Sequence, residues 1–113
     1  TAPQVTIGTA TIANAASLSD VVDCTAGRLA RIDMPNAWTA AAITIQVSED
    51  GTQFFDLYTA AGVEYSITAA ANHAIILPPD DFKGARYVKV RSGPAGAAVA
   101  QGGVRILKLV LVA

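Results

Sequence analysis

Apolar and polar residues alternate with a period of two along most of this chain. In the clearest segment, Ala42–Ser48, the apolar face would hold Ile43, Ile45 and Val47, with polar residues between them. Arg86–Arg91 repeats the pattern around Val88 and Val90. A period of two is typical of a β-strand with one buried face, and no segment keeps a helical period beyond about two turns.

The same alternation predicts further strands, which are separated by turn signals such as the glycine and proline clusters. In Arg28–Met34 the buried side would be Ala30, Ile32 and Met34, and Pro35 would stop the strand. The predicted strands are Val5–Ile12, Ser19–Cys24, Arg28–Met34, Ala42–Ser48, Gln53–Tyr58, Glu64–Thr68, His73–Leu77, Arg86–Arg91 and Val104–Ala113. Two alanine-rich pieces, "NAWTAAA" and "TAAANHA", are expected to be loops with at most one helical turn.

Eight or nine short strands at this spacing predict an all-β fold, an antiparallel jelly-roll-like β-sandwich of about eight strands. We expect one domain over residues 1–113, with residues 1–12 as an N-terminal arm or an edge strand. The last strand is apolar on both faces, so we expect it to be central in a sheet or covered by a neighbouring subunit. The residues predicted to form a subunit interface are Val5, Ile7, Leu107, Leu109 and Leu111.

Composition supports association and argues against two classes of partner. Of the 113 residues, 52% are hydrophobic and only 15% charged, and the net charge is −1. Low charge weakens self-repulsion and permits oligomers. There is no basic run to neutralise phosphates, so no nucleic acid is expected, and no apolar run approaches the ~20 residues of a membrane span. The start "TAPQVTIG" has no secretion-signal pattern, so none is expected in this numbering.

The acidic stretch "SEDGTQ" is the first candidate for chemistry. Asp50 and Gly51 between alternating strands favour a hairpin turn, because both residues accept positive φ. A calcium loop would need more oxygen ligands at regular spacing, and a catalytic carboxylate pair would need a pocket. We therefore interpret this stretch as a turn, with a weak ion site as the alternative.

The remaining candidates also have simpler structural explanations. Cys24 and His73 could form a nucleophilic pair, but a lone cysteine usually behaves as a small buried hydrophobe. Trp38, with Asn36 beside it, could stack on a sugar ring, whereas an aromatic plug at the end of the sandwich is favoured.

The segment "DDFKGARYVKVR" could meet an acidic partner through its basic residues. A solvated outer face carrying Arg86, Lys89 and Arg91 is favoured instead. We expect no catalytic residue, no metal and no cofactor, and hence no enzyme.

From Met34 to the C-terminus the chain resembles a family of small β-sandwich structural proteins of tailed bacteriophages. The resemblance is carried by the Trp38–Ala41 lead-in, "QVSEDG", "FFDLY", "ARYVKVRSG" and Gln101 before the last strand. It implies a virion protein without catalytic residues: a capsid decoration (cement) protein or a head-fibre or spike protein. Its expected location is the capsid surface, after synthesis in the host cytoplasm. Its expected partners are other copies of itself, with a homotrimer as first guess, and the major capsid protein or another virion protein.

A second resemblance supports an alternative function. "ITIQVSEDGTQFFDLY" followed by "ARYVKVR" is similar to discoidin-like, galactose-binding jelly rolls. This resemblance implies a glycan-binding adhesion module with its ligand at the loops of one end, for which Trp38 and Asn36 are the candidate residues.

Overall fold

The alternating segments of the sequence form nine β-strands in the computed structural model, which describes residues 5–113. The strands are β1 (Val5–Ile12), β2 (Val22–Asp23), β3 (Arg28–Asp33), β4 (Ile43–Ser48), β5 (Phe55–Asp56), β6 (Ser66–Ile67), β7 (Ala74–Ile76), β8 (Tyr87–Ser92) and β9 (Arg105–Val112). Among these residues the one helix is a short 3₁₀ turn, η1 (Pro79–Phe82). Within the described range, no helix has the length and apolarity needed to cross a bilayer.

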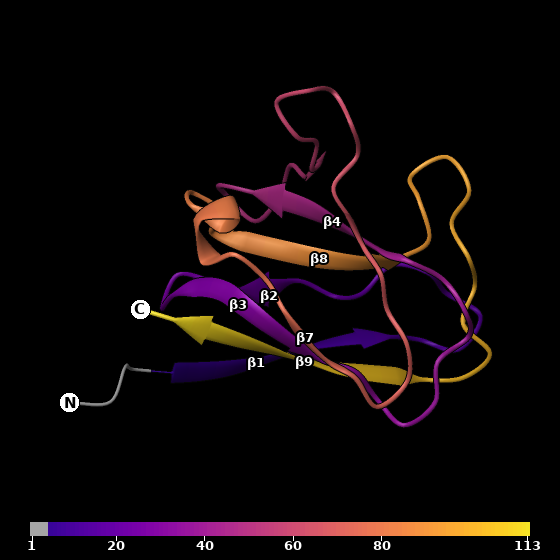
Figure 1. Ribbon diagram of the computed structural model, residues 1–113. Coiled ribbons are helices and arrows are strands. Elements are labelled where there is room, and N and C mark those ends of the chain that lie inside the picture. The colour runs from indigo at the N-terminus through magenta and orange to yellow at the C-terminus, as the bar shows by residue number, and fades with distance from the viewer. Residues whose placement is uncertain (1–4) are drawn as a thin grey trace.

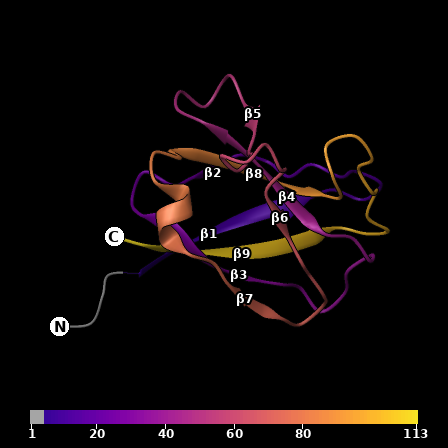
Figure 2. The same cartoon turned by 45° about the horizontal axis from the view of Figure 1, so that its top comes forward.

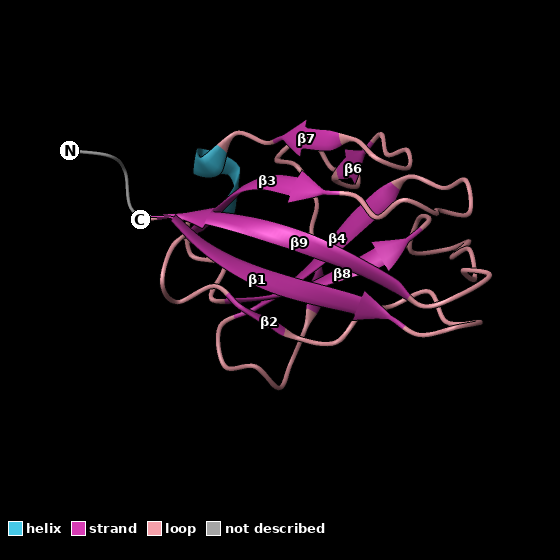
Figure 3. Cartoon of the chain, turned by 90° about the horizontal axis from the view of Figure 1, so that it is seen from below, coloured by secondary structure: helices cyan, strands magenta, loops and turns pink. Residues whose placement is uncertain are grey.

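The strands form two antiparallel sheets that pack face to face (Figure 1). One sheet has the order β1-β9-β3-β7, and Figure 3 shows it from its outer side. The other has the order β2-β8-β4-β5, with β6 also paired to β4. Successive strands cross repeatedly from one sheet to the other, which is the connectivity of a jelly roll. The predicted all-β sandwich is therefore confirmed.

The core lies between the two sheets and is built from the inward positions of the alternating strands. Because side chains alternate across a strand, every second residue of β4, β8 and β9 points inward. The largest fully buried apolar side chains are Ile12, Leu29, Ile32, Ile43, Ile45, Phe82, Val88, Val90, Leu107, Leu109 and Leu111. The period of two in the sequence thus corresponds directly to the inner faces of the sandwich.

The two-faced apolar strand β9 lies between β1 and β3. Of the two environments expected for it, the central position in a sheet is the one observed. The prediction that Leu107, Leu109 and Leu111 form a subunit interface is wrong, because the core of the chain itself buries all three almost completely. The error arose because β9 is apolar on both faces. Its sequence therefore does not show which face packs against the five-stranded sheet of the same chain.

Strand β3 departs from the predicted alternation. Its register against β9 shifts between Leu29, opposite Leu111, and Arg31, opposite Val110, so Ala30 is an extra residue. Such a bulge allows two residues on one strand to oppose one on its neighbour. Leu29 and Ile32 are buried as a result, whereas Ala30, which was predicted to be buried, is only half-buried.

Several other strands are shorter than predicted. β2, β5, β6 and β7 have two or three residues each, because the chain turns away from the sheet soon after pairing. The alanine-rich pieces before β4 and before β7 are loops, as expected. The helical turn lies instead at "PPDD", where Pro79 occupies the first turn of η1.

Candidate functional site

The outer side of the four-stranded sheet carries exposed apolar side chains. One row of paired residues crosses all four strands: Ile7 on β1, Val110 on β9, Arg31 on β3 and Ile76 on β7. Ile7 is 57% exposed and Ile76 is 83% exposed, although both are large and apolar. We call the apolar residues of this surface the outer apolar face, and they are Val5, Ile7, Ile76, Ile106, Val110 and Val112. Val110 is buried and Val112 half-buried, and the exposed charged residues Arg31 and Lys108 lie on the same side of the sheet.

Val5 and Ile7, the two β1 residues predicted to lie at an interface, are exposed at one edge of the outer apolar face. Ile76 and Ile106 were not among the residues predicted to form an interface. Ile106 could have been found, because it alternates with the core leucines of β9 and so must point outward once they point inward. Ile76 lies on a three-residue strand whose pattern was too short to assign a face.

Arg91 is buried on the outer side of the other sheet, which contradicts its prediction as part of a solvated surface. Its side chain is 8% exposed. Its Nη1 donates to Asp56 Oδ1 at 2.8 Å, Nη2 to Glu64 Oε2 at 3.0 Å and Nε to Thr44 Oγ1 at 3.0 Å. The guanidinium thus joins β8 to β4, to β5 and to the residues just before β6.

The other basic residues of this segment remain near the surface. Arg86 is exposed, as predicted. Lys89 is half-buried, and its Nζ lies 4.5 Å from the centre of the Phe54 ring. A contact of this kind is a cation–π interaction. No continuous basic patch results, because the third member, Arg91, is covered.

Gln101 joins three loops at the end of the sandwich where β9 begins. Its Oε1 accepts the N–H of Thr39 at 2.8 Å, and its Nε2 donates to Thr39 O at 3.1 Å and to Ser92 Oγ at 2.6 Å. Arg105 Nε donates to the same Oε1 at 3.0 Å. The amide therefore pairs with the backbone of Thr39 as a neighbouring strand would.

All buried side-chain nitrogen and oxygen atoms in the described part of the chain have a hydrogen-bond partner. The two polar networks around Arg91 and Gln101 are therefore fully satisfied. A buried polar group is costly when it lacks a partner and adds rigidity when it has one. Both networks fix loops and expose no reactive group.

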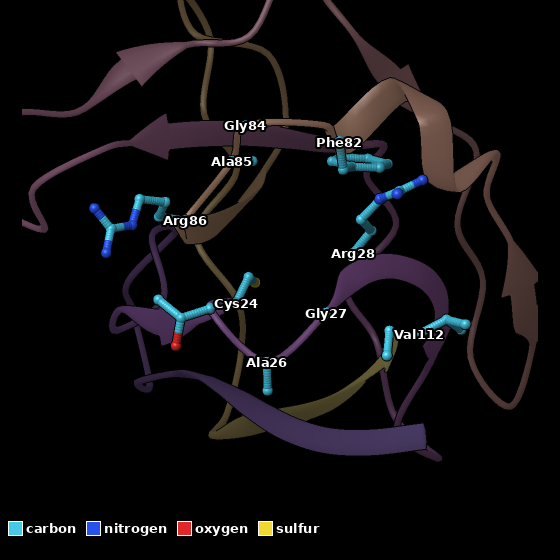
Figure 4. A pocket seen from close by; sticks show the side chains of 11 residues that line it. Cys24, Ala26, Gly27, Arg28, Phe82, Gly84, Ala85, Arg86 and Val112 are labelled. Atoms are coloured by element: carbon cyan, nitrogen blue, oxygen red, sulfur yellow. The ribbon is translucent and has the colours of Figure 1, made fainter. Parts of the chain in front are cut away.

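A cavity of about 410 Å³ opens at the opposite end, where β3 begins and β9 ends (Figure 4). It is lined by Cys24, Thr25, Ala26, Gly27, Arg28, Phe82, Gly84, Ala85, Arg86, Val112 and Ala113. The side chains of Arg28 and Arg86 extend to opposite sides, away from each other (Figure 4). Arg28 instead meets Asp80 at 3.3 Å in an exposed pair. The cavity thus lacks a set of charged groups that converge on one point.

Cys24 lies in the wall of this cavity with its thiol protonated at neutral pH. Burial, and secondarily the charge of Asp23, raises the pKa of Cys24 to about 11. The thiolate is the nucleophilic form, so the raised pKa suppresses reactivity. His73 is exposed and lies at the far end of β3, where its carbonyl accepts the N–H of Met34. The length of β3 separates the two residues, so a Cys–His pair is ruled out.

A smaller cavity of about 220 Å³ lies beside the connection between β5 and β6. Its lining residues are Leu57, Tyr58, Thr59, Ala60, Tyr65 and Asp81. The Tyr65 hydroxyl donates to Asp81 Oδ2 at 2.9 Å, and its ring meets Phe82 edge to face. Burial, followed by this hydrogen bond and the Asp81 charge, raises the pKa of Tyr65 to about 12. One side of the cavity therefore combines an aromatic ring with a fixed carboxylate.

The acidic stretch after β4 forms a turn, as predicted. Asp50 Oδ1 accepts the N–H groups of Thr52 and Gln53 at 2.9 and 3.0 Å, and the Ser48 hydroxyl at 3.0 Å. These bonds, that from Thr52 first, hold the pKa of Asp50 below its usual range. Gly51 has φ of 78°, which glycine adopts without strain. The connection runs from Val47 to its partner Phe55.

Trp38 packs against the core from the loop between β3 and β4, as the plug interpretation predicts. Its Nε1 donates to Ala41 O at 3.1 Å, which fixes the indole within its own loop. Asn36 is exposed nearby. In the described residues, no group of three or more His, Cys, Asp or Glu side chains has an arrangement that could hold a metal ion.

A scan against protein-family models finds no match for this chain, and searches of curated proteins and of solved structures find none either. Functional inference therefore depends on the surfaces and cavities described above, together with the sequence resemblance.

Proposed function

We propose that this chain is a non-enzymatic structural protein of a tailed-bacteriophage virion. In this role it is a capsid decoration protein, or a head-fibre or spike protein, that associates with copies of itself and binds the capsid shell. The sequence resemblance from Met34 onward suggests the virion. The outer apolar face is the observation that supports a binding role.

The outer apolar face supports the proposal because it leaves large apolar side chains in water. Single exposed apolar residues are common on proteins, but contiguous apolar patches usually mark interaction sites. Here Val5 and Ile7 lie beside Val112 and Val110 on the adjacent strand, which makes a contiguous apolar area at the β1 edge. Ile76 is separated from this area by Arg31, and Ile106 is separated from it by Lys108. Association with the shell or with another copy would remove this surface from water.

The rigidity of the scaffold is also consistent with a structural role. The Arg91 and Gln101 networks anchor loops at the outer side of one sheet and at one end of the sandwich. A protein that binds as a preformed body does not lose the entropy of ordering loops on assembly.

Density-gradient fractionation of the native phage lysate, with the chain quantified by mass spectrometry in each fraction, tests this proposal. Co-migration with DNA-filled particles at high copy number supports a shell protein. Low copy number on the same particles supports a spike or tail position. Recovery only in the particle-free fractions would overturn the virion proposal.

A matched pair of variants tests the outer apolar face itself. Ile106 on the four-stranded sheet and Phe55 on the five-stranded sheet are each 52% exposed. We expect Ile106→Asp to lower the number of copies per particle and Phe55→Asp to leave it unchanged. Equal effects would mean that this face is not the attachment surface.

Glycan binding is the second candidate function, and the cavity beside Tyr58 and Tyr65 favours it. An exposed tyrosine ring can stack on the apolar side of a sugar, and the Asp81 carboxylate can accept its hydroxyl groups. Trp38, the residue first considered for this role, instead packs against the core. Under this proposal Tyr58→Ala abolishes binding on a glycan array and Tyr87→Ala does not. No binding by the wild-type chain at millimolar glycan would exclude it.

A further inference from the structure

Strand β1 has a free edge that is long, uncharged and open. Among the described strands its one ladder neighbour is β9, and it forms one edge of its sheet (Figure 3). At the other sheet edges, β2, β5 and β7 have two or three residues, whereas β1 has eight. Natural sheets protect their edges by short strands, charged residues, prolines or bulges. Val5–Ile12, "VTIGTATI", contains none of these features.

The hydrogen bonds of Thr11 show which residues face this edge. Its N–H donates to Asp20 Oδ1 at 2.9 Å, and its carbonyl accepts the N–H of Asp20 at 3.2 Å. Both groups therefore point away from β9. In an antiparallel pair the direction of these groups alternates along the strand, so the N–H and C=O of Val5, Ile7 and Thr9 point to the same edge.

These six backbone groups are unused by the part of the chain that the structure describes. At Thr11 the edge is closed by Asp20, which precedes β2. For Val5, Ile7 and Thr9, no backbone or side-chain partner is found in the described residues outside the β1–β9 ladder. Val5, Ile7 and Thr9 are also exposed. The edge can therefore receive another strand over residues 5–9.

We infer that β1 pairs antiparallel with β1 of a second copy of this chain, about a two-fold axis at Ile7. This inference deepens the self-association in the proposed function. Residue 7 of one copy then lies opposite residue 7 of the other, and residue 5 lies opposite residue 9. Each of these three pairs exchanges two hydrogen bonds, about six in all. The two four-stranded sheets become one continuous sheet.

The second copy is the occupant that the edge fits best. Two copies match in length and in the alternation of donors and acceptors. The segment carries no charge, so the copies do not repel each other across the axis. Pairing also places the two Ile7 side chains against each other, which joins the two outer apolar faces. An isologous contact of this kind closes on itself as a dimer, which replaces the trimer expected from the sequence.

A pair of matched variants tests the interface on the purified chain, without virions. Ile7 and Ile76 lie in one row on the same face but at opposite edges of the sheet. We expect wild type to show twice the single-chain mass of 11.6 kDa by light scattering. Ile7→Lys places like charges opposite each other, so the dissociation constant should rise by about 100-fold. Ile76→Lys, which makes the same change away from the axis, should leave the constant unaltered.

The register is tested by mixing variants of opposite charge. Ile7→Lys and Ile7→Glu should each be monomeric alone and should form a mixed dimer when combined, because residue 7 opposes residue 7. Thr9→Pro gives a second route: it removes a free-edge N–H without removing a bond to β9, and it should also yield monomers.

Three results would overturn the inference. They are a single-chain mass at all concentrations up to about 1 mM, a trimer, or a dimer that Ile7→Lys does not weaken. If the chain is a monomer in solution but still co-migrates with particles, the dimer inference is wrong and the virion proposal is unaffected. If the chain is a dimer but never associates with particles, the virion proposal is wrong and the dimer inference is unaffected.

Discussion

The guanidinium of Arg91 lies 2.8 Å from the carboxylate of Asp56, although the two residues are 35 positions apart in the sequence. A second carboxylate, that of Glu64, lies 3.0 Å from the same guanidinium and also accepts the N–H of Ala95. One covered arginine thus fixes β5, the residues before β6 and the loop after β8. Arg91 lies on the outer side of the five-stranded sheet. The segments that it holds therefore form a third, partial layer over the sandwich.

Replacement of Arg91 by methionine should destabilise the fold. Methionine keeps much of the packing but removes the hydrogen bonds of the guanidinium to Asp56, Glu64 and Thr44. Removing one member of a buried ion pair costs about 3–5 kcal/mol, and we expect about 2–4 kcal/mol here because water reaches both carboxylates. Urea denaturation measures this loss. Arg86→Met is the control, since Arg86 is exposed; an equal loss in both variants would mean that the ion pairs contribute nothing.

The stability of the chain should decrease in acid through Asp56. Hydrogen bonds from Arg91 and then from Gln46 hold the pKa of Asp56 below its usual range. The folded state therefore favours the ionised carboxylate. Its contribution is present above the unfolded pKa of about 3.9 and is lost as the pH falls through the lower folded pKa.

Urea denaturation at a series of pH values from neutral to about pH 2 should show this loss of free energy of unfolding. Asp56→Asn should flatten the acid limb of the curve, because asparagine does not titrate. An acid limb identical to wild type would assign the effect to other carboxylates, of which Asp23 and Asp50 also have a lowered pKa.

Gln101→Glu should destabilise the end of the sandwich at which β9 begins. A carboxylate oxygen would replace Nε2, which donates to the carbonyl of Thr39 and to Ser92 Oγ. Two acceptors would then face each other in a buried place, at a cost of about 2 kcal/mol or more. Gln53→Glu makes the same chemical change at an exposed position and should stay within about 0.5 kcal/mol of wild type. Thermal unfolding of both variants distinguishes a network role for Gln101 from a general effect of charge.

Leu109→Ala should reduce the stability of the single chain and leave its association unchanged. Leu109 is completely buried, so the loss should be about 2–5 kcal/mol. Ile106→Ala, at an exposed position on the same strand, should cost about 1 kcal/mol or less. Denaturation gives the free energy, and light scattering at a temperature where both variants are folded gives the mass. A change in mass for Leu109→Ala without a loss of stability would return this residue to the interface.

The alternation of residues predicted the positions of β1, β4, β8 and β9, because the inner face of each strand is read directly from a period of two. It could not predict the bulge at Ala30, which depends on how β3 pairs with a strand more than seventy residues later. It also assigned Arg91 to solvent. The alternation gave the correct side of β8, but the segments that cover that side come from Asp56 and Glu64, far from Arg91 in the sequence.

The candidate surface was harder to predict than the fold. The sequence showed that β9 is apolar on both faces. Which face is buried depends on the position of the five-stranded sheet, which covers Leu109 and leaves Ile106 exposed. An N-terminal arm or an edge strand was predicted over residues 1–12, and β1 is an edge strand. The sequence could not show which of these two forms it takes, because an edge is defined by the strand that is missing beside it. Only the strand order of the folded sheet reveals that β1 has a single neighbour.

The position of β9 between β1 and β3 also sets an order of events during synthesis. Among the described strands β1 has a ladder partner only in β9, so β1 stays without a ladder until Arg105–Val112 has been synthesised. Contacts of such sequence separation make folding slow. During that interval the chain presents both edges of β1 instead of one. Because an unpaired strand edge is prone to pair with another chain, pairing between copies is most favoured before β9 is in place.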